Sequence, residues 1–458
     1  MKRLYLPIRA IRTRALPLFA IAAALGCSSD KTDGASAGAA SSEGGASSSG
    51  GAASGGTQGN GGTSSGDGAS AGASNGGSSA STGGGSSGGS SSGAGGATGA
   101  GGSTTVSMGT PSAKALAAKL GRSHFLIGMG NDLNNDHDMD GAYTLGTTLD
   151  VHYAYLTGLS NMNNTGWPDW NTDGSFVNLL TDSAKSHGVV PMFTTYGMAA
   201  DGENNLSVLT DDTYMGDYWD TQKLMFQRLA MFDGPAMVNF EPDFWGFTEQ
   251  AAPNGDPSKL PVHVTAHAPD CASLTDDLVG LGKCLVLLAR KYAPKVVVGF
   301  HASAWANGDP TKIASFLVAI GAGDADFMTT DTLDRDAGCY EAGTDPNCQR
   351  GGSGYYWSDT DFQNHLTWVK AMTDGVNRPM LWWQTPFGVP SDTPGGTKGR
   401  YRDNRVQYIF SHVNDFIAAG GVGAVFGTGA GNQTYIDSDG DQFKNAVSAY
   451  FAAPVALQ

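Results

Sequence analysis

The chain is long and acidic. It has 458 residues, with 27 Lys and Arg against 43 Asp and Glu, and a formal net charge of −16. Residues 1–106 hold six of the basic and four of the acidic residues, so 21 basic and 39 acidic residues remain and residues 107–458 carry a net charge of −18. A negative charge of this size argues against nucleic acid or an anionic membrane surface as a partner. We expect a monomer.

The N-terminus has the features of an export signal. Basic residues precede an apolar run from Ala15 to Leu25. Eleven residues are too few to cross a bilayer, which takes roughly 20 in a helix, so residues 1–27 indicate a cleaved signal peptide. The sequence Ala24-Leu25-Gly26-Cys27 resembles a lipobox, after which bacterial lipoproteins are cut and acylated. This predicts lipidation of Cys27 and a place in the bacterial cell envelope, lipid-anchored at the outer surface or secreted. An ordinary secretory signal with a chance cysteine is the alternative.

Residues 28–106 are almost entirely Gly, Ser, Ala and Thr, without an aromatic residue. Such a segment has too little apolar surface to offset the entropy of ordering its backbone. We expect a disordered Gly/Ser-rich tether with an end-to-end distance on the order of 50 Å. Membrane contact would then be through the N-terminal lipid alone.

Four cysteines lie in residues 107–458. An even number in an exported chain predicts two disulfides. Among the three possible connectivities we favour Cys271 with Cys284 and Cys339 with Cys348, since the members of each pair are close in sequence. Zinc binding is the competing interpretation, but the cysteines show no CxxC spacing.

A repeated pattern fills residues 107–458: a short apolar run, a polar loop, then an amphipathic helix. The apolar runs are His124–Met129, Val151–Leu156, Val189–Thr194, Ala236–Phe240, Val296–Phe300, Phe327–Thr330, Met380–Trp383 and Gly423–Phe426. The helical stretches are Phe176–His187, Tyr218–Phe232, Thr275–Tyr292, Thr311–Ile320, Asp361–Thr373, Asn404–Ala418 and Gln442–Phe451. Several runs lack alternation, as expected of parallel strands covered on both faces. The pattern predicts an α/β fold, the (β/α)8 TIM barrel, rather than an open doubly wound sheet, for which a phosphate-binding glycine motif is missing.

Polar and aromatic residues gather where the predicted strands end. In a barrel these ends form the large concave face that carries the chemistry. Aromatic rings stack on the C–H faces of sugars while acids and amides bind hydroxyls, so we expect a carbohydrate site. Its expected substrate-binding residues are Asp132, His152, Tyr155, Tyr196, Asp243, Trp245, His301, Trp305, Trp383 and Gln384. The alternative is that the aromatic residues only fill the top of the barrel.

Glu241 is the expected proton donor. Along the fourth strand a period of two places Met237, Asn239 and Glu241 on one face. A carboxyl at the inner edge of a barrel, among aromatic rings, should have its pKa raised by burial, as a general acid requires. The alternative is a structural glutamate paired with an arginine or a backbone amide.

The sequence Asn239-Phe240-Glu241-Pro242, with the aromatic strand ends, resembles the (β/α)8 glycoside hydrolases, over roughly residues 115–452. Within these hydrolases, the sequence most resembles the large clan whose acid/base Glu ends strand four and whose nucleophile Glu ends strand seven. The resemblance implies an acid/base role for Glu241. In the clan the Asn directly precedes the Glu, whereas here Phe240 stands between them. The strand-seven position holds Gln384, an amide that cannot act as the nucleophile, so that role does not carry over.

The second carboxyl must then come from another strand end. Two carboxyls lie about 5 Å apart in retaining glycosidases and about 6.5–9.5 Å apart in inverting ones. Asp331, at the end of the sixth strand, is the preferred partner of Glu241, and Asp132 and Asp243 are its rivals.

Metal sites find little support. The segments Asp132–Gly141 and Asp437–Asp441 space their oxygens as calcium loops do, but they lack the terminal bidentate Glu, and solvated turns explain them. His263 and His267 could bind a metal if helical, which Pro261 and its β-branched neighbours oppose. We expect no cofactor and no protein-bound metal, with calcium as the open alternative.

The leading hypothesis is an exported, surface-tethered glycoside hydrolase that cleaves a poly- or oligosaccharide by carboxyl acid/base chemistry. A non-catalytic carbohydrate-binding lipoprotein on a barrel scaffold is the alternative, to which Gln384 lends weight. A metal-dependent hydrolase or deacetylase built on His301, His152 and nearby Asp is a weaker third.

Overall fold

The structure is a computed structural model, and it describes residues 112–458 apart from 131–132, 135–136, 139–140, 148, 162–165, 349–352 and 394–395. The predicted signal peptide, Cys27, the tether and Asp132 lie outside the described residues. Among the helices in the described part of the chain, none is both long and apolar enough to span a membrane.

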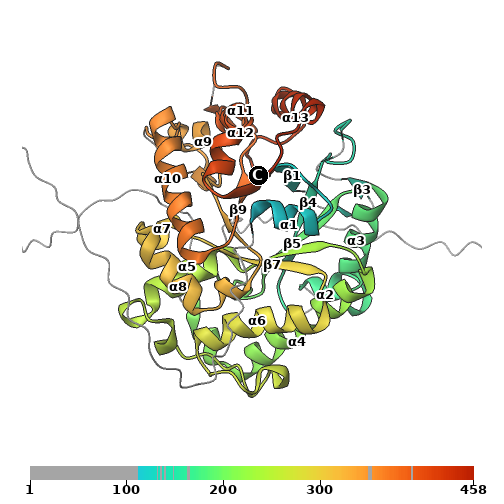
Figure 1. Ribbon diagram of the computed structural model, residues 1–458, viewed down its shortest axis with the longest axis vertical. Coiled ribbons are helices and arrows are strands. Elements are labelled where there is room, and N and C mark those ends of the chain that lie inside the picture. Colours follow the sequence, from blue (N-terminus) through green and yellow to red (C-terminus); the bar gives the residue numbers. More distant parts are fainter. Residues whose placement is uncertain are drawn as a thin grey trace, which may run out of the picture. The chain divides into compact units, whose positions relative to one another are not determined.

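Eight parallel strands close into a barrel, which confirms the predicted fold (Figure 1). In order around the barrel they are β1 (Leu126–Gly130), β4 (Val151–Thr157), β5 (Val190–Tyr196), β6 (Ala236–Phe240), β7 (Val296–His301), β8 (Phe327–Thr330), β9 (Met380–Thr385) and β12 (Gly421–Phe426). The last strand pairs with the first, with Leu126 opposite Gly423. Each predicted apolar run overlaps one of these strands.

Helices surround the barrel (Figure 1). They are α1 (Ala113–Lys119), α2 (Trp167–Trp170), α3 (Phe176–Ser186), α4 (Asp212–Phe232), α5 (Pro242–Ala251), α6 (Leu278–Tyr292), α7 (Ala304–Asn307), α8 (Pro310–Ala319), α9 (Ala337–Ala342), α10 (Asp359–Val376), α11 (Arg405–Ser411), α12 (Val413–Ala418) and α13 (Gln442–Ala452). The predicted helix Asn404–Ala418 is two helices, which meet at His412.

Short elements lie in the connections. Two hairpins pair β2 (Leu133–Asn134) with β3 (His137–Asp138) and β10 (Gly396–Thr397) with β11 (Arg400–Tyr401). Single 3₁₀ turns span Thr172–Gly174, Leu206–Thr210, Pro253–Gly255, Pro257–Lys259, Pro269–Cys271, Ala322–Asp324 and Pro346–Cys348.

The strands alternate between the barrel interior and the helix layer. Asn239 of β6 accepts a 2.8 Å hydrogen bond from the Thr329 hydroxyl of β8, two strands away, so both side chains face the interior. The neighbouring Phe240 faces outward, with its ring 6.2 Å from that of Phe226 on α4. All five β6 residues are buried. A strand buried on both faces explains the uninterrupted apolar runs.

Two aspartates secure the end of the barrel where the strands begin. Asp150, just before β4, accepts hydrogen bonds from Arg122 and from the backbone N–H of Ile127. Asp326, just before β8, pairs with Lys119 of α1 and Arg290 of α6. Polar residues at this end of a barrel serve stability, since the concave face lies at the other end.

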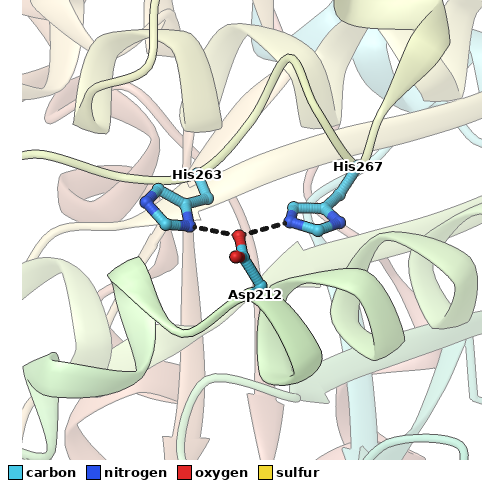
Figure 2. A group of neighbouring side chains, drawn as sticks. All are labelled: Asp212, His263 and His267. Atoms are coloured by element: carbon cyan, nitrogen blue, oxygen red, sulfur yellow. Dashed lines mark hydrogen bonds and ion pairs between the residues drawn. The ribbon is translucent and has the colours of Figure 1, made fainter.

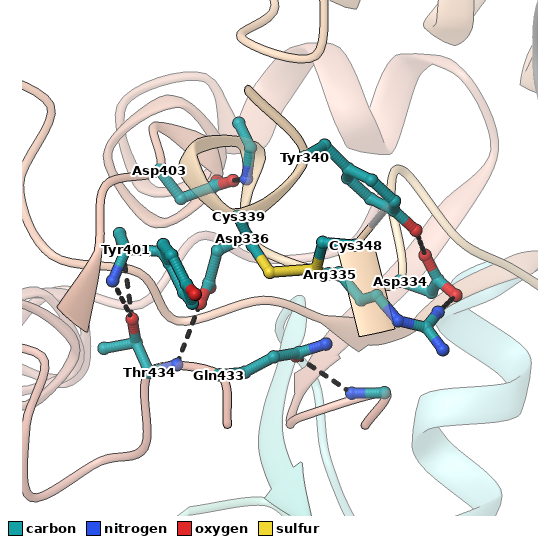
Figure 3. The surroundings of a disulfide bond; sticks show 12 residues. Asp334, Arg335, Asp336, Cys339, Tyr340, Cys348, Tyr401, Asp403, Gln433 and Thr434 are labelled. Carbon is teal, nitrogen blue, oxygen red and sulfur yellow. Dashed lines mark hydrogen bonds and ion pairs between the residues drawn. A yellow bond between two sulfur atoms is a disulfide. The ribbon is translucent and has the colours of Figure 1, made fainter. Parts of the chain in front are cut away.

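Both predicted disulfides are confirmed. Cys271 is bonded to Cys284 and Cys339 to Cys348, each with a Cα–Cα distance of 5.6 Å. The second bond lies in a small apolar cluster beside the main core, made of Leu333, Ala337, Cys339, Tyr340, Cys348 and Tyr401 (Figure 3). It therefore stiffens the connection that follows β8.

Candidate active site

Aromatic rings fill the mouth of the barrel, meaning the end where the strands have their carboxyl termini. The Trp383 ring of β9 lies 6.2 Å from the ring of Tyr155 on β4 and 5.7 Å from that of His301 on β7. Trp383 and His301 are buried, whereas Tyr155 is half-buried. Trp383 and His301 thus form the floor of the mouth, and Tyr155 rises toward its opening.

Hydrogen bonds connect the polar side chains above this floor. The Gln384 amide donates to the Tyr155 hydroxyl at 2.6 Å. The Tyr155 ring lies 5.9 Å from that of Tyr196 on β5, whose hydroxyl donates to Asp243 Oδ2 at 3.0 Å. The structure therefore brings these four predicted residues, from strands β4, β5 and β9 and the first turn of α5, into one group.

Asp331 and Glu203 share an electrostatic environment with Asp243. Burial, followed by the neighbouring Asp243 carboxylate, raises the pKa of Asp331 to about 7. The same two causes raise the pKa of Glu203, in the connection between β5 and α4, to about 7. All three carboxyls are half-buried. The mouth therefore holds two carboxyls that keep a proton close to neutral pH.

Asp243 accepts a hydrogen bond from the Tyr196 hydroxyl. Burial raises its pKa, while the hydrogen bond from Tyr196 and the charge of Arg335 lower it. Arg335 follows β8 and is paired with Asp334, whose other oxygen accepts a 2.6 Å hydrogen bond from the Tyr340 hydroxyl (Figure 3). Arg335 also lowers the pKa of Asp331 and of Glu203, so its charge acts on all three carboxyls.

A buried ion pair lies behind Asp331. Arg405 and Asp403 are both fully buried, with Nη1 and Oδ2 3.1 Å apart. The same Asp403 oxygen accepts a 2.7 Å hydrogen bond from the backbone N–H of Ala337. The charge of Arg405 also lowers the pKa of Asp331. The ion pair therefore holds the connection after β8 in place, and its arginine lowers the pKa of Asp331.

Glu241 is not placed as the sequence predicted. Its side chain is 1% exposed and its two oxygens accept hydrogen bonds from the backbone N–H groups of Gly197 and Met198, at 3.1 and 3.0 Å. The Gln222 amide of α4 approaches it at 3.5 Å. The carboxyl thus lies beneath the connection between β5 and α4, and the prediction that it opens into the mouth is wrong. Burial raises its pKa to about 7, but these contacts favour the structural alternative.

The backbone explains this reversal. Glu241 has a φ of +42° and a ψ of 62°, the left-handed region that a non-glycine residue adopts at a cost in energy. The strand therefore ends at Phe240. The period of two that places Asn239 inward no longer applies to Glu241, two residues later. Gln384, near the end of β9, shares this feature with a φ of +55°.

Two other predicted binding residues lie outside the mouth. The His152 ring of β4 lies 4.4 Å from the Tyr143 ring and faces α3, because its neighbour Tyr153 takes the inward position. Trp245 of α5 is 1% exposed, donates a 2.7 Å hydrogen bond to the carbonyl of Phe240, and packs at 5.0 Å against the outward-facing Phe300. Both are core residues in this structure.

Trp305 occupies an intermediate position. It lies on α7, is half-buried, and packs against Phe247 of α5 with 4.8 Å between ring centroids. Its indole Nε1 is buried without a hydrogen-bond partner. The placement on a helix that follows β7 puts it on the same end of the barrel as the mouth.

The buried histidines do not assemble a metal centre at the mouth. His301 faces the interior and contacts the Thr329 hydroxyl at 3.1 Å, whereas His152 faces the helices. Burial lowers the pKa of each to about 3, so both are neutral. The third hypothesis, which needs these two residues together, is therefore contradicted.

In the segment at residues 437–441, which was considered for calcium, the central acid Asp439 binds backbone N–H groups instead. Asp439 is buried, and its oxygens accept hydrogen bonds from the backbone N–H groups of Asp441 and Phe443 at 2.8 and 2.9 Å. These bonds hold the first turn of α13. In the other segment, Asp132–Gly141, the acids Asp132, Asp136 and Asp140 lie outside the described residues.

Two residues of the mouth were not predicted. Glu203 is one of only four glutamates in residues 107–458 and follows a predicted strand, which is a usable signal. Arg335 stands between Asp334 and Asp336, and a lone arginine in an acidic segment after a strand end is a similar signal. Both residues lie in long connections, where strand periodicity does not predict which way a side chain points.

No family model matches the chain, and the search of curated proteins found no match. Among solved structures, the GH53 catalytic domain of Ignisphaera aggregans is similar at 12% identity, covering 70% of this chain and 95% of that one, with a TM-score of 0.39. The β-mannanase of Mytilus edulis is similar at 13% identity, covering 73% and 94%, with a TM-score of 0.41. D-psicose 3-epimerase of Clostridium cellulolyticum is similar at 12% identity, covering 72% and 100%, with a TM-score of 0.37. All three are similar to this chain at 12–13% identity, and a similarity at this level carries no argument about activity.

Proposed function

We propose that the mouth of this barrel hydrolyses glycosidic bonds, with Asp331 and Asp243 as the two carboxyls. The observation that carries the proposal is that Asp243 accepts a hydrogen bond from the Tyr196 hydroxyl beside the Tyr155 ring, and that its carboxylate is close enough to Asp331 to raise the pKa of that acid. Asp243 raises the pKa of Asp331, while Tyr196 and Arg335 favour the ionised form of Asp243. Glycosidases need one carboxyl that is protonated and one that is ionised.

The roles follow from these environments. Asp331, with a pKa of about 7, holds a proton that it can give to the oxygen of the leaving sugar. Asp243 accepts the Tyr196 hydrogen bond as an anion and serves as the second carboxyl, either attacking the sugar carbon or activating water. Glu203 is the third acid of the group, and its pKa is also raised to about 7.

The rings provide the sugar-binding surface. Tyr155 and Tyr196 are half-buried and adjacent, and Gln384 holds the Tyr155 hydroxyl in place. Such rings stack on the C–H faces of a sugar, while the amide and carboxyl oxygens bind its hydroxyls. This supports a poly- or oligosaccharide as the substrate class.

The experiment is sugar release from a panel of polysaccharides by the wild type, Asp331→Asn and the control Asp324→Asn. Asp324 is an exposed acid in the 3₁₀ turn Ala322–Asp324, which precedes β8. We expect the wild type and the control to release sugar and Asp331→Asn to be slower by about 10²–10⁴-fold. Equal rates for all three proteins would remove Asp331 from the mechanism.

Gln384 favours one second candidate, a barrel that binds glycans without cleaving them. An amide stands at the strand-seven position where the resembling clan has its nucleophile. Calorimetric binding of an oligosaccharide with an unchanged product profile over days would support this candidate. Turnover by the wild type would exclude it.

We propose further that the protein is exported and tethered by a lipid on Cys27. The lipobox-like sequence supports this, as do two disulfides, which persist in oxidising compartments. The test is fractionation of cells producing the wild type or Cys27→Ser. We expect the wild type in the membrane fraction and the variant in the soluble one; the same distribution for both would contradict the anchor.

A further inference from the structure

Three potential metal ligands converge at the start of α4 (Figure 2). Asp212 is the first residue of that helix, and His263 and His267 lie in the connection between β6 and α6. Asp212 Oδ1 is 2.9 Å from His263 Nδ1 and 3.0 Å from His267 Nε2. The three ligand atoms all lie within 4.8 Å of one another.

The histidines converge without a helix. The sequence predicts that residues 263–267 are not helical, and the structure agrees, since they form a turn. Within it the backbone N–H groups of Val264 and Thr265 donate to Asp276 Oδ1, at 3.0 and 2.7 Å. The spacing of i to i+4 therefore brings the two rings to 6.3 Å through a turn that Asp276 holds. The missing helix therefore does not keep the two rings apart.

Hydrogen bonds hold both the backbone N–H and the carbonyl of His263. The backbone N–H of His263 donates to the Leu209 carbonyl at 2.8 Å, and its carbonyl accepts from the Trp219 indole at 3.0 Å. The disulfide between Cys271 and Cys284 follows shortly after the turn. These contacts preorganise the ligands, which reduces the ordering cost of binding a metal.

Hydrogen bonding alone leaves one nitrogen unsatisfied. His267 Nε2 forms a hydrogen bond with Asp212, whereas His263 Nδ1 is buried and lacks hydrogen-bond geometry despite its short distance to the same oxygen. The side chains of His263 and His267 are 37% and 22% exposed and that of Asp212 is 77% exposed, so the group is open to solvent on one side. A cation that enters from that side would engage all three ligand atoms.

We propose that Asp212, His263 and His267 bind a divalent transition metal of the zinc type. Two imidazoles and one carboxylate suit Zn²⁺, Fe²⁺, Co²⁺ or Ni²⁺ rather than calcium, which prefers oxygen ligands alone. The remaining coordination positions face water. None of the three residues belongs to the group proposed for hydrolysis, so this site goes beyond that function. Its effect is to join the start of α4 to the connection between β6 and α6.

The experiment is calorimetric titration of the full chain with zinc chloride, on protein made without a polyhistidine tag. The variants are His267→Gln, His263→Ala and Asp212→Asn, and the control is Asp220→Asn, an exposed acid on the same helix. We expect one zinc ion per chain for the wild type and the control. Each ligand variant should bind it about tenfold or more weakly.

Thermal unfolding with and without zinc gives a readout independent of any activity. We expect zinc to raise the Tm of the wild type and the control by about 3 °C or more and to leave the three variants within error. Zinc affinity that is the same in the wild type and in every ligand variant would overturn the proposal, as would the absence of zinc binding by the wild type. Because three separate variants are compared, misfolding of one does not decide the result.

Discussion

The hydroxyl of Tyr196, the last residue of β5, donates a 3.0 Å hydrogen bond to Oδ2 of Asp243, in the first turn of α5. Asp243 in turn raises the pKa of both Asp331 and Glu203. One hydroxyl therefore helps to decide which carboxyl of the mouth is ionised.

Removing that hydroxyl should weaken the ionised form of Asp243. In Tyr196→Phe the pKa of Asp243 rises, because the hydrogen bond that lowers it is gone. We expect the acidic limb of the pH–rate profile to move to higher pH and kcat/KM at neutral pH to fall about tenfold, the effect of one hydrogen bond to a charged group. The control is Tyr292→Phe, which removes a similar bond of 2.7 Å to Asp270. Equal profiles for both variants would contradict the role of Tyr196.

The activity should decrease as the proton donor ionises. Asp331 has a pKa of about 7, so its protonated fraction declines above neutral pH. We expect kcat/KM to fall about tenfold for each pH unit well above that value, and the fall to depend on this residue. Steady-state rates between pH 5 and 9 are the measurement. A rate that stays flat or increases up to pH 9 would rule out a protonated Asp331.

The same carboxyl should make stability depend on pH. Its folded pKa lies above the ordinary value of 3.8, so its contribution to the free energy of unfolding is present below about pH 4 and is lost as pH rises through about 7. Asp331→Asn cannot ionise. We therefore expect the decline in unfolding free energy between pH 5 and 8 to be smaller in the variant, by about 1–2 kcal/mol after allowing for partial exposure. Urea unfolding at both pH values measures it, and equal declines would count against the raised pKa.

Glu241 should matter for stability. Glu241→Ala leaves the backbone N–H groups of Gly197 and Met198 buried without their partners, and it opens a cavity. We expect a loss of about 2–4 kcal/mol in the free energy of unfolding. Glu249→Ala is the matched control, since Glu249 is a buried glutamate at the other end of α5 whose side chain bonds with Asn307 instead. The control should lose clearly less; an equal loss would mean that the two backbone contacts contribute little.

The barrel was predictable because its signal is repeated. Eight apolar runs, each followed by a polar connection and an amphipathic stretch, leave few folds that bury all of them. The disulfide pairing was predictable because the members of each pair are close in sequence and the number of cysteines is even. The helix Asn404–Ala418 was predicted as one because the break at His412 involves no proline or glycine.

The site was predictable only in part. Tyr155, Tyr196, Asp243 and Gln384 meet because strand ends in a parallel barrel share one face. His152 was misplaced, since a pattern of alternation does not say which of two adjacent polar residues faces inward. Glu241 was misplaced because a left-handed residue ends the strand, and Glu203 and Arg335 lie in connections without any period.

The most direct measurement compares Asp243→Asn with Glu241→Gln for sugar release from the best substrate of the wild type, per mole of folded protein. The structure predicts that Asp243→Asn is slower than wild type by about 10²–10⁴-fold, whereas Glu241→Gln keeps at least about a tenth of the wild-type rate. Loss of activity in folded Glu241→Gln together with wild-type rates in Asp243→Asn would contradict the account.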